Sequence, residues 1–233
     1  MLPTDCLHSL TVDFERAAAP VRAAFDFSAE DLSGFSCQAG RAGAPLLLIC
    51  TSRALHLIST SDGHVRAFRP VLARIRERGQ NVEGWRGLPV RAASGSDAAR
   101  VLLRQAVPAT GFEPEVHQFI SELRAAAERS REWGAFSNEL ASLVRMTEHA
   151  SARVWEETRL GCLGSSEAEL ELETLVAERI VEEELVGWQS SYPAARSSRR
   201  PISEPNILPF EGEERHSMIV LRTGNVLSKL RTA

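Results

Sequence analysis

Histidines and cysteines are the side chains of this chain best suited to metal binding or nucleophilic attack, and their spacing predicts neither chemistry. No two of the six histidines stand four residues apart, the spacing that places two imidazoles on one face of a helix. The four cysteines are scattered and form no C-x-x-C pair. We therefore predict no catalytic residue, no metal site and no cofactor, and we expect Cys50 to be a buried free thiol in an apolar strand.

Two further patterns contain residues that could take part in catalysis or ligand binding. Glu148-His149 and Glu156-Glu157 lie on one expected helix as an acid–base set, but glutamate-rich helices produce such pairs by chance. The arginines of residues 65–78 are spaced to contact phosphate, yet they lack the interleaved aromatic residues of a single-strand nucleic-acid binder. Both patterns are better explained as solvated helix faces.

The composition excludes some classes of protein. Apolar residues make up 43% of the chain and charged residues 25%, which are values of a folded globular protein. The net charge of -4 hides an asymmetry, because residues 1–136 hold 16 arginines against 15 acids and residues 137–233 hold 11 cations against 16 acids. This balance argues against a dedicated nucleic-acid binder and allows a basic protein as partner for the second half.

The first 112 residues predict a small α/β domain, in which short apolar runs give strands and apolar residues at helical spacing give helices. The expected strands cover 45–51, 53–59 and a short segment within 79–95. The expected helices cover 13–25 with an interruption at Pro20, 65–77 and 97–107. The glycine-rich residues 34–43 are expected to form a loop.

Residues 113–233 predict a second, helical domain that closes in a hairpin, so the fold class is α+β. Pro114 opens its first helix, and Ser137 is the expected N-cap of a longer second one. Ser166 and Glu169 form the capping box of a third helix, which Gly187 is expected to end.

The third helix is rich in acids. Eight glutamates occupy its exposed positions between residues 167 and 184. An acidic solvated face is the commoner explanation of such a pattern, and an interface for a basic protein is the alternative. The residues that would contact a basic partner are Glu167, Glu171, Glu178 and Glu182.

The order of the elements resembles the creatinase/aminopeptidase P family, in which a small α/β domain precedes a catalytic domain with the pita-bread fold. The resemblance is carried by LLLICTSRALHLISTSDG, by the helix pair of residues 139–180, and by the segment from Tyr192 through MIVLRTGNVLSKLRT. It implies that residues 113–233 form the first part of a pita-bread-like domain.

Two positions in this resemblance depart from the active metallopeptidases. Where the family places its first metal-ligand aspartate this chain has Arg222, and Lys229 lies near the position of the second. Divalent metals need deprotonated carboxylates or neutral imidazole, so two cations at these positions would repel the ions. The resemblance therefore implies a relative without peptidase activity, with Arg222 and Lys229 as binding residues.

The peptidase-like N-terminal domain of the large subunit of the FACT histone chaperone is a relative of this kind. It is similar to this chain in its helix pair and in the dipeptide Tyr192-Pro193. The similarity implies a non-catalytic module that binds peptides or proteins, among them a basic partner such as a histone. The alternative is an enzyme of the creatinase/Xaa-Pro peptidase type that acts on peptides or small C–N substrates as a dimer or with a second chain.

Two further expectations concern assembly and location. The terminal hairpin leaves an unpaired edge over residues 226–230, and such an edge allows a homodimer. No secretory signal or membrane span is predicted, and the scattered cysteines indicate a reducing compartment, the cytoplasm or the nucleus.

Overall fold

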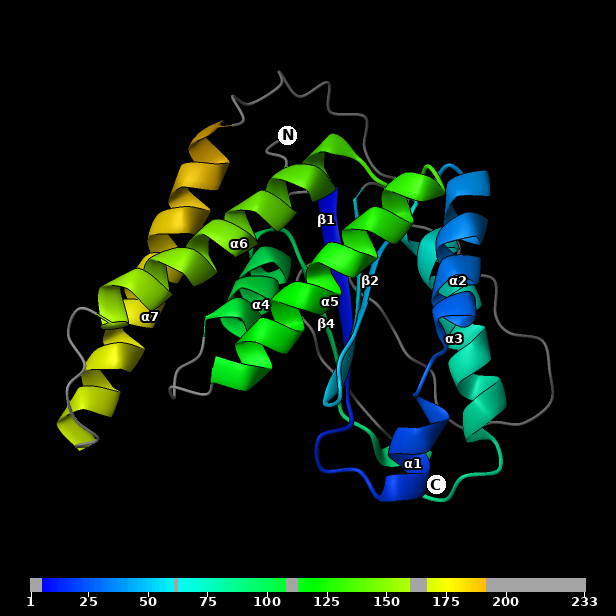
Figure 1. Ribbon diagram of the computed structural model, residues 1–233. Helices are drawn as coiled ribbons and strands as arrows, with labels where there is room; N and C mark the ends of the chain where they lie inside the picture. Colours follow the sequence, from blue (N-terminus) through cyan, green and yellow to red (C-terminus); the bar gives the residue numbers. More distant parts are fainter. Residues whose placement is uncertain (1–5, 61–62, 108–112, 160–166, 192–233) are drawn as a thin grey trace.

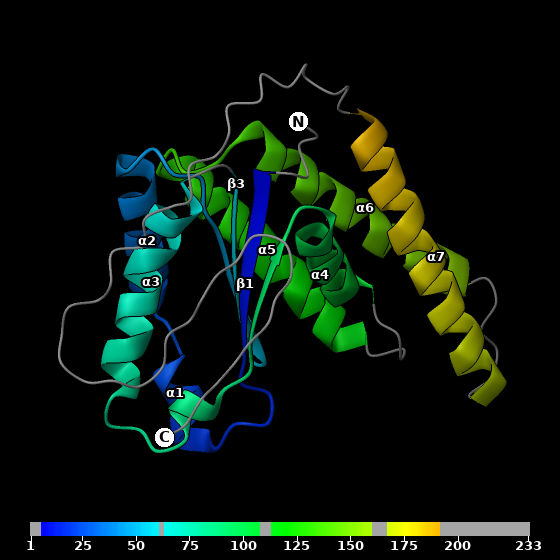
Figure 2. The same ribbon diagram turned by 180° about the vertical axis from the view of Figure 1, so that it is seen from behind.

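The fold is a four-stranded sheet with helices on both faces, which confirms the α+β class (Figure 1 and Figure 2). The computed structural model describes residues 6–60, 63–107, 113–159 and 167–191. The strands are β1 (Leu7–Asp13), β2 (Leu47–Cys50), β3 (Ala54–Thr60) and β4 (Val90–Ser94). The helices are α1 (Ala19–Ala24), α2 (Ala29–Arg41), α3 (His64–Gly79), α4 (Ser96–Ala106), α5 (Glu113–Glu132), α6 (Asn138–Arg159) and α7 (Glu167–Ser191), with a 3₁₀ turn at Trp85–Gly87.

The sheet is antiparallel throughout, with the strand order β2-β3-β1-β4. β2 and β3 form a hairpin, whereas α1 and α2 connect β1 to β2, and α3 connects β3 to β4. Each helical connection therefore passes over one intervening strand. This interlocked pair of βαβ units is the topology of ferredoxin-like folds.

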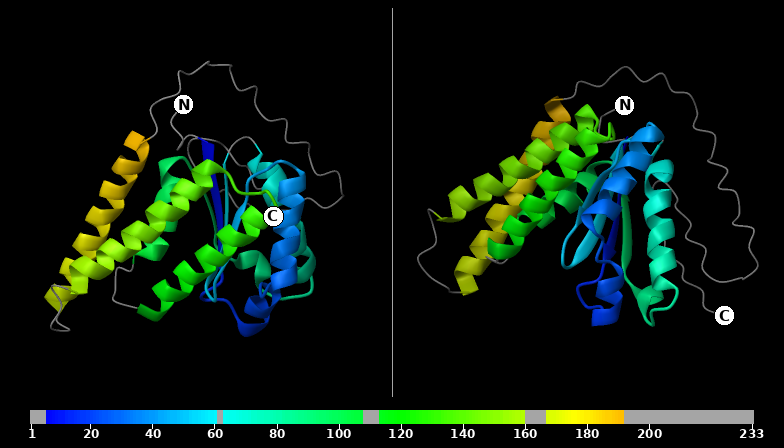
Figure 3. Two further views of the ribbon diagram at one scale, coloured as in Figure 1. Left: turned by 45° about the horizontal axis from the view of Figure 1, so that its top comes forward. Right: turned by 45° about the vertical axis from the view of Figure 1, so that its right-hand side comes forward.

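Two hydrophobic cores lie on opposite faces of the sheet, giving three layers (Figure 3). The alternation of strand side chains directs Leu10 and Leu57 to the face covered by α1, α2 and α3. Ile49 and Ile58 point to the other face, where they pack with α4, α5, α6 and α7. This second core joins residues on both sides of position 112, so the two parts expected as separate domains share it.

Two of the secondary-structure predictions for the segment before β2 are wrong. Residues 34–41, most of the expected loop 34–43, lie in α2, because a capping box starts the helix: the Asp31 amide donates to Ser28 Oγ at 3.1 Å, and the Asp31 carboxylate accepts from the Ser28 amide. The helix expected over 13–25 begins only at Ala19, with Pro20 in its first turn, and a strand that was not predicted ends at Asp13.

The helical half follows the predictions more closely. The Leu140 amide donates to Ser137 Oγ at 3.2 Å, which confirms the predicted N-cap of α6. α7 does not end at Gly187, because Trp188 is buried and its indole nitrogen donates to Ser142 Oγ at 3.1 Å, so burial holds the last turn helical to Ser191. Ser166 and the hairpin with its edge at 226–230 lie outside the described residues.

None of the helices in the described ranges combines the length and the apolarity needed to cross a bilayer.

Candidate functional site: the edges of the sheet

The edge of the sheet at β2 is covered by the last turn of α5 and the residues that follow it. Pairing with β3 leaves the backbone groups of Leu46 and Leu48 pointing away from the sheet. The Leu46 amide donates to Ala135 O at 2.9 Å, and Ser130 Oγ donates to Leu46 O at 2.6 Å. An Arg129 guanidinium nitrogen lies 3.4 Å from Leu48 O. Described residues of the same chain thus bond both backbone groups of Leu46, just before β2, and the carbonyl of Leu48 within it.

We predict that Ser130→Ala destabilises the fold, since Ser130 is fully buried and its loss leaves the Leu46 carbonyl without its hydroxyl donor. An unsatisfied buried carbonyl costs roughly 1–3 kcal/mol. Chemical denaturation measures the loss. Ser190→Ala is the control, because that exposed hydroxyl donates only within its own helix, and its loss should leave the stability unchanged within about 0.5 kcal/mol.

The opposite edge, at β4, is open. The Gly95 amide donates to Leu7 O and the Asp13 amide donates to Pro89 O, which sets the alternation of hydrogen bonds between β1 and β4. It follows that the N–H and C=O groups of Val90, Ala92 and Ser94 point away from β1. No hydrogen bond from another described residue reaches these groups, and no further strand within the described ranges pairs with β4.

The side chains of β4 do not protect this edge. Val90 is 48% exposed, Arg91 and Ser94 are exposed, and Ala92 and Ala93 are half-buried. Natural proteins block open edges with prolines, bulges and charged side chains. β4 contains no proline, and Arg91 is its one charged residue. The strand therefore presents an unblocked row of backbone donors and acceptors.

The acidic helix α7 is engaged with arginines of the same chain. Arg100 of α4 donates to both carboxylate oxygens of Glu182, at 3.0 and 3.1 Å, and Arg104 donates to Glu178 at 3.0 Å. The hydrogen bond from Arg100 lowers the pKa of the Glu182 carboxyl. A basic partner at these two glutamates would have to compete with Arg100 and Arg104.

Further ion pairs join α7 to α6. Arg153 donates to Glu183 at 2.7 Å and to Glu184 at 2.8 Å. His149 lies 3.0 Å from Glu184. The acidic residues of this segment of α7 therefore help to hold it against its neighbours.

The side chains of the remaining predicted binding residues lie outside the part of the chain that the structure describes. Glu167 and Glu171 belong to α7, but their side chains lie outside the described part of the chain, as do Arg222 and Lys229 altogether. Their contact with a partner stays a prediction.

Cys50 and His56 lie near the β2–β3 hairpin, and the structure makes both poor reactive groups. Cys50 donates to Phe25 O at 3.6 Å, and burial raises the pKa of its thiol to about 11, so the nucleophilic thiolate is scarce at neutral pH. His56 is 1% exposed, and burial lowers the pKa of its imidazole to about 4. Its Nδ1 lies 3.1 Å from Thr11 Oγ1, whereas Nε2 has no hydrogen-bond partner among the described residues.

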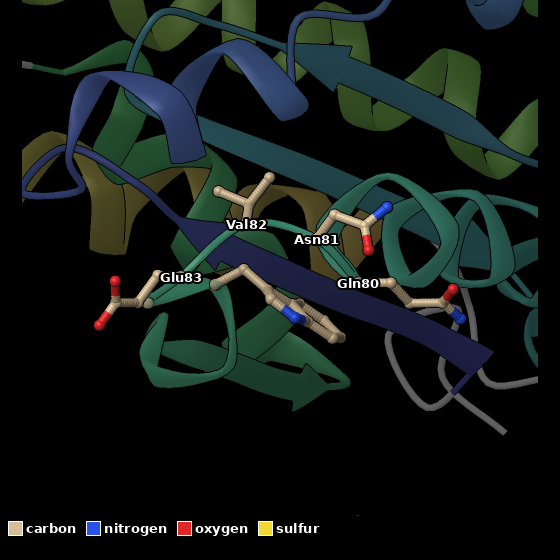
Figure 4. Close-up of a pocket in the computed structure, with 6 residues that line it drawn as sticks. Gln80, Asn81, Val82 and Glu83 are labelled. Atoms are coloured by element: carbon tan, nitrogen blue, oxygen red, sulfur yellow. The ribbon is translucent and has the colours of Figure 1, made fainter.

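A shallow hollow of about 370 Å³ lies in the connection between α3 and β4 (Figure 4). Its lining comes from the six consecutive residues 80–85, with Glu83 as their one charged side chain. No side chain from another described element lines the hollow, so it lacks the converging polar groups of a ligand-binding site.

Fold and edge together define an α+β sandwich of ferredoxin-like topology with one closed and one open sheet edge. No known family and no curated protein matches this sequence. Among solved structures, glutamyl-tRNA reductase from Methanopyrus kandleri is similar, with a TM-score of 0.50 and 18% sequence identity. The match covers 79% of this chain and 47% of that one, so the chain spans about half the length of its structural neighbour.

This similarity corrects the resemblance to the creatinase/aminopeptidase P family. The neighbour has a different fold from the pita-bread enzymes, and its match extends over most of this chain. The expected relation to the creatinase/aminopeptidase P family, with its pita-bread fold, and the relation to the FACT domain are therefore wrong. The misleading signal was the order of a strand pair and long helices, which unrelated α+β folds share.

The open edge was missed at the sequence level. A short strand within 79–95 was expected, and β4 confirms it. Its position at the end of the sheet depends on the strand order: β4 pairs with β1 and not with β3, the strand that precedes it in the sequence. The small residues Ala92 and Ala93 are compatible with either a central or an edge position, so they gave no local signal.

Proposed function

We propose that this protein is a non-catalytic module that binds another protein by accepting an extended segment of it alongside β4. The observation that supports this function is the contrast between the two edges of the sheet. At the β2 edge, Ala135 O accepts from the Leu46 amide, and Ser130 and Arg129 donate to the carbonyls of Leu46 and Leu48, whereas the outward groups of Val90, Ala92 and Ser94 have no hydrogen-bond partner among the described residues. Addition of a strand to an open edge is a common mode of peptide recognition.

The side chains of β4 suggest the chemistry of the bound segment. Val90 lies on the face of the sheet that carries Leu10 and Val12, so an apolar residue of the partner would pack there. Arg91 lies on the other face and is exposed, which favours an acidic residue at the neighbouring position of the partner. The proposed location is inside the cell, in the cytoplasm or the nucleus, where free thiols such as Cys50 persist.

Selection from a library of random peptides against the full chain tests this proposal. The counter-selection uses Ala92→Pro, because the Ala92 amide points away from β1 and its loss leaves the sheet bonds intact. Enriched peptides should bind this variant at least about fivefold more weakly, as measured by fluorescence anisotropy. Circular dichroism checks that the variant is folded. Failure to enrich any peptide, or equal binding to both proteins, would contradict the proposal.

A second function, chemistry on an aminoacyl-tRNA, has the shared fold in its favour, because the structural neighbour is a glutamyl-tRNA reductase. Anisotropy with labelled glutamyl-tRNA and with the uncharged tRNA tests it. Preference for the charged tRNA would support this function over peptide binding. Equal or no binding would count against it.

A further inference from the structure

The open edge has a second property: its outward groups are arranged symmetrically about one residue. Val90 and Ser94 lie two residues on either side of Ala92, and the backbone groups of all three point away from β1. Two copies of such a strand can pair antiparallel about a two-fold axis at Ala92. In this register Ala92 faces Ala92 of the second copy, and Val90 faces its Ser94, so every outward group of one strand meets one of the other.

The side chains are compatible with this pairing. Val90 would lie beside Ser94 of the second copy on one face of the joined sheet. On the other face, Arg91 would lie beside Ala93 of the second copy, so no like charges stand directly opposite each other. The residues at the centre, Ala92 and Ala93, are small, so they leave room on both faces of the joined sheet for the side chains of the second copy.

We infer that a second copy of this chain occupies the β4 edge, so that two four-stranded sheets join into one continuous sheet. This inference rests on the proposed function, because it concerns the same edge. Pairing of two copies buries the groups that a partner segment would bind. The monomer is then the binding form, and a bound peptide shifts the protein from dimer to monomer.

Paired charge substitutions test the register. Val90 and Ser94 are exposed, and they face each other only between copies, so changing them leaves the monomer intact. Sedimentation velocity of the full chain over a wide range of concentration gives the dimer dissociation constant. Val90→Lys combined with Ser94→Lys places lysines opposite each other twice per dimer and should weaken association about tenfold. Val90→Lys combined with Ser94→Glu creates two ion pairs and should restore it.

Each outcome distinguishes the inference from the proposed function. A wild-type chain that stays monomeric, or a dimer that responds equally to both double variants, would overturn the inference. Peptide binding to that monomer would leave the proposed function standing. If dimers follow the charge pattern but the peptide selection fails, the edge serves self-association and the proposed function falls.

Discussion

Replacing Gly40 by Ala is expected to destabilise the fold by roughly 3 kcal/mol or more. Gly40 lies in the last turn of α2, where a Cβ would come within 1.8 Å of the Trp133 carbonyl oxygen and 3.0 Å of its carbon. A backbone carbonyl cannot rotate aside as a side chain can. Residues 133–135 would have to shift, and with them the Ala135 carbonyl that accepts from the Leu46 amide.

Gly34→Ala is the matched control on the same helix. A Cβ at Gly34 meets nothing within 4 Å, so the alanine should only improve helix propensity and stabilise the protein by up to about 1 kcal/mol. Thermal and denaturant unfolding of both variants measure the two effects. Similar stabilities of Gly40→Ala and Gly34→Ala would mean that α2 does not touch the segment after α5 as described.

Acid should weaken the fold through His56. The pKa of this imidazole is about 4 in the folded chain, against 6.5 for an ordinary histidine, and burial is the main cause. Its neutral form therefore contributes its full stability above pH 6.5, and this contribution is lost as pH falls towards 4, because the unfolded chain takes up a proton that the folded chain excludes. The loss amounts to roughly 3 kcal/mol by pH 4.

His56→Asn separates this effect from the titration of carboxyl groups. An asparagine amide can reach the Thr11 hydroxyl in place of Nδ1, but it does not titrate. The free energy of unfolding is measured between pH 7.5 and 4, and the slope below pH 6.5 should be shallower in the variant by about one proton. Identical slopes would show that His56 is protonated in the folded protein. An NMR signal of His56 that titrates near pH 6.5 would show the same.

The two edges of the sheet differ in how far other parts of the chain cover them. The last turn of α5 and the residues after it lie against the β2 edge, so a partner strand cannot add there without displacing Ser130 and Ala135. β4 has no such cover within the described residues. If strand addition occurs in this protein, it is therefore directed to one edge, where either a partner or a second copy can bind but not both.

The sequence by itself determined the local structure of much of this protein. Apolar runs located β2 and β3, helical spacing located α3 and α4, and the Ser137 hydroxyl marked the start of α6. These signals are contained within a few residues of each other. The same local signals failed for α2, whose glycines suggested a loop, because the reason for Gly40 lies in its contact with Trp133, 93 positions further along the chain.

The tertiary structure alone decided the properties on which the proposed site depends. In the sequence, Glu182 and Glu178 belong to an acidic helix face that is expected to be solvated. In the structure they accept hydrogen bonds from Arg100 and Arg104, which lie 82 and 74 residues away along the chain. The hydroxyl that closes the β2 edge stands 84 residues from the carbonyl it satisfies. The burial of His56 and the open edge of β4 follow from the strand order. Contacts between distant residues set that order, and no local pattern of side chains encodes it.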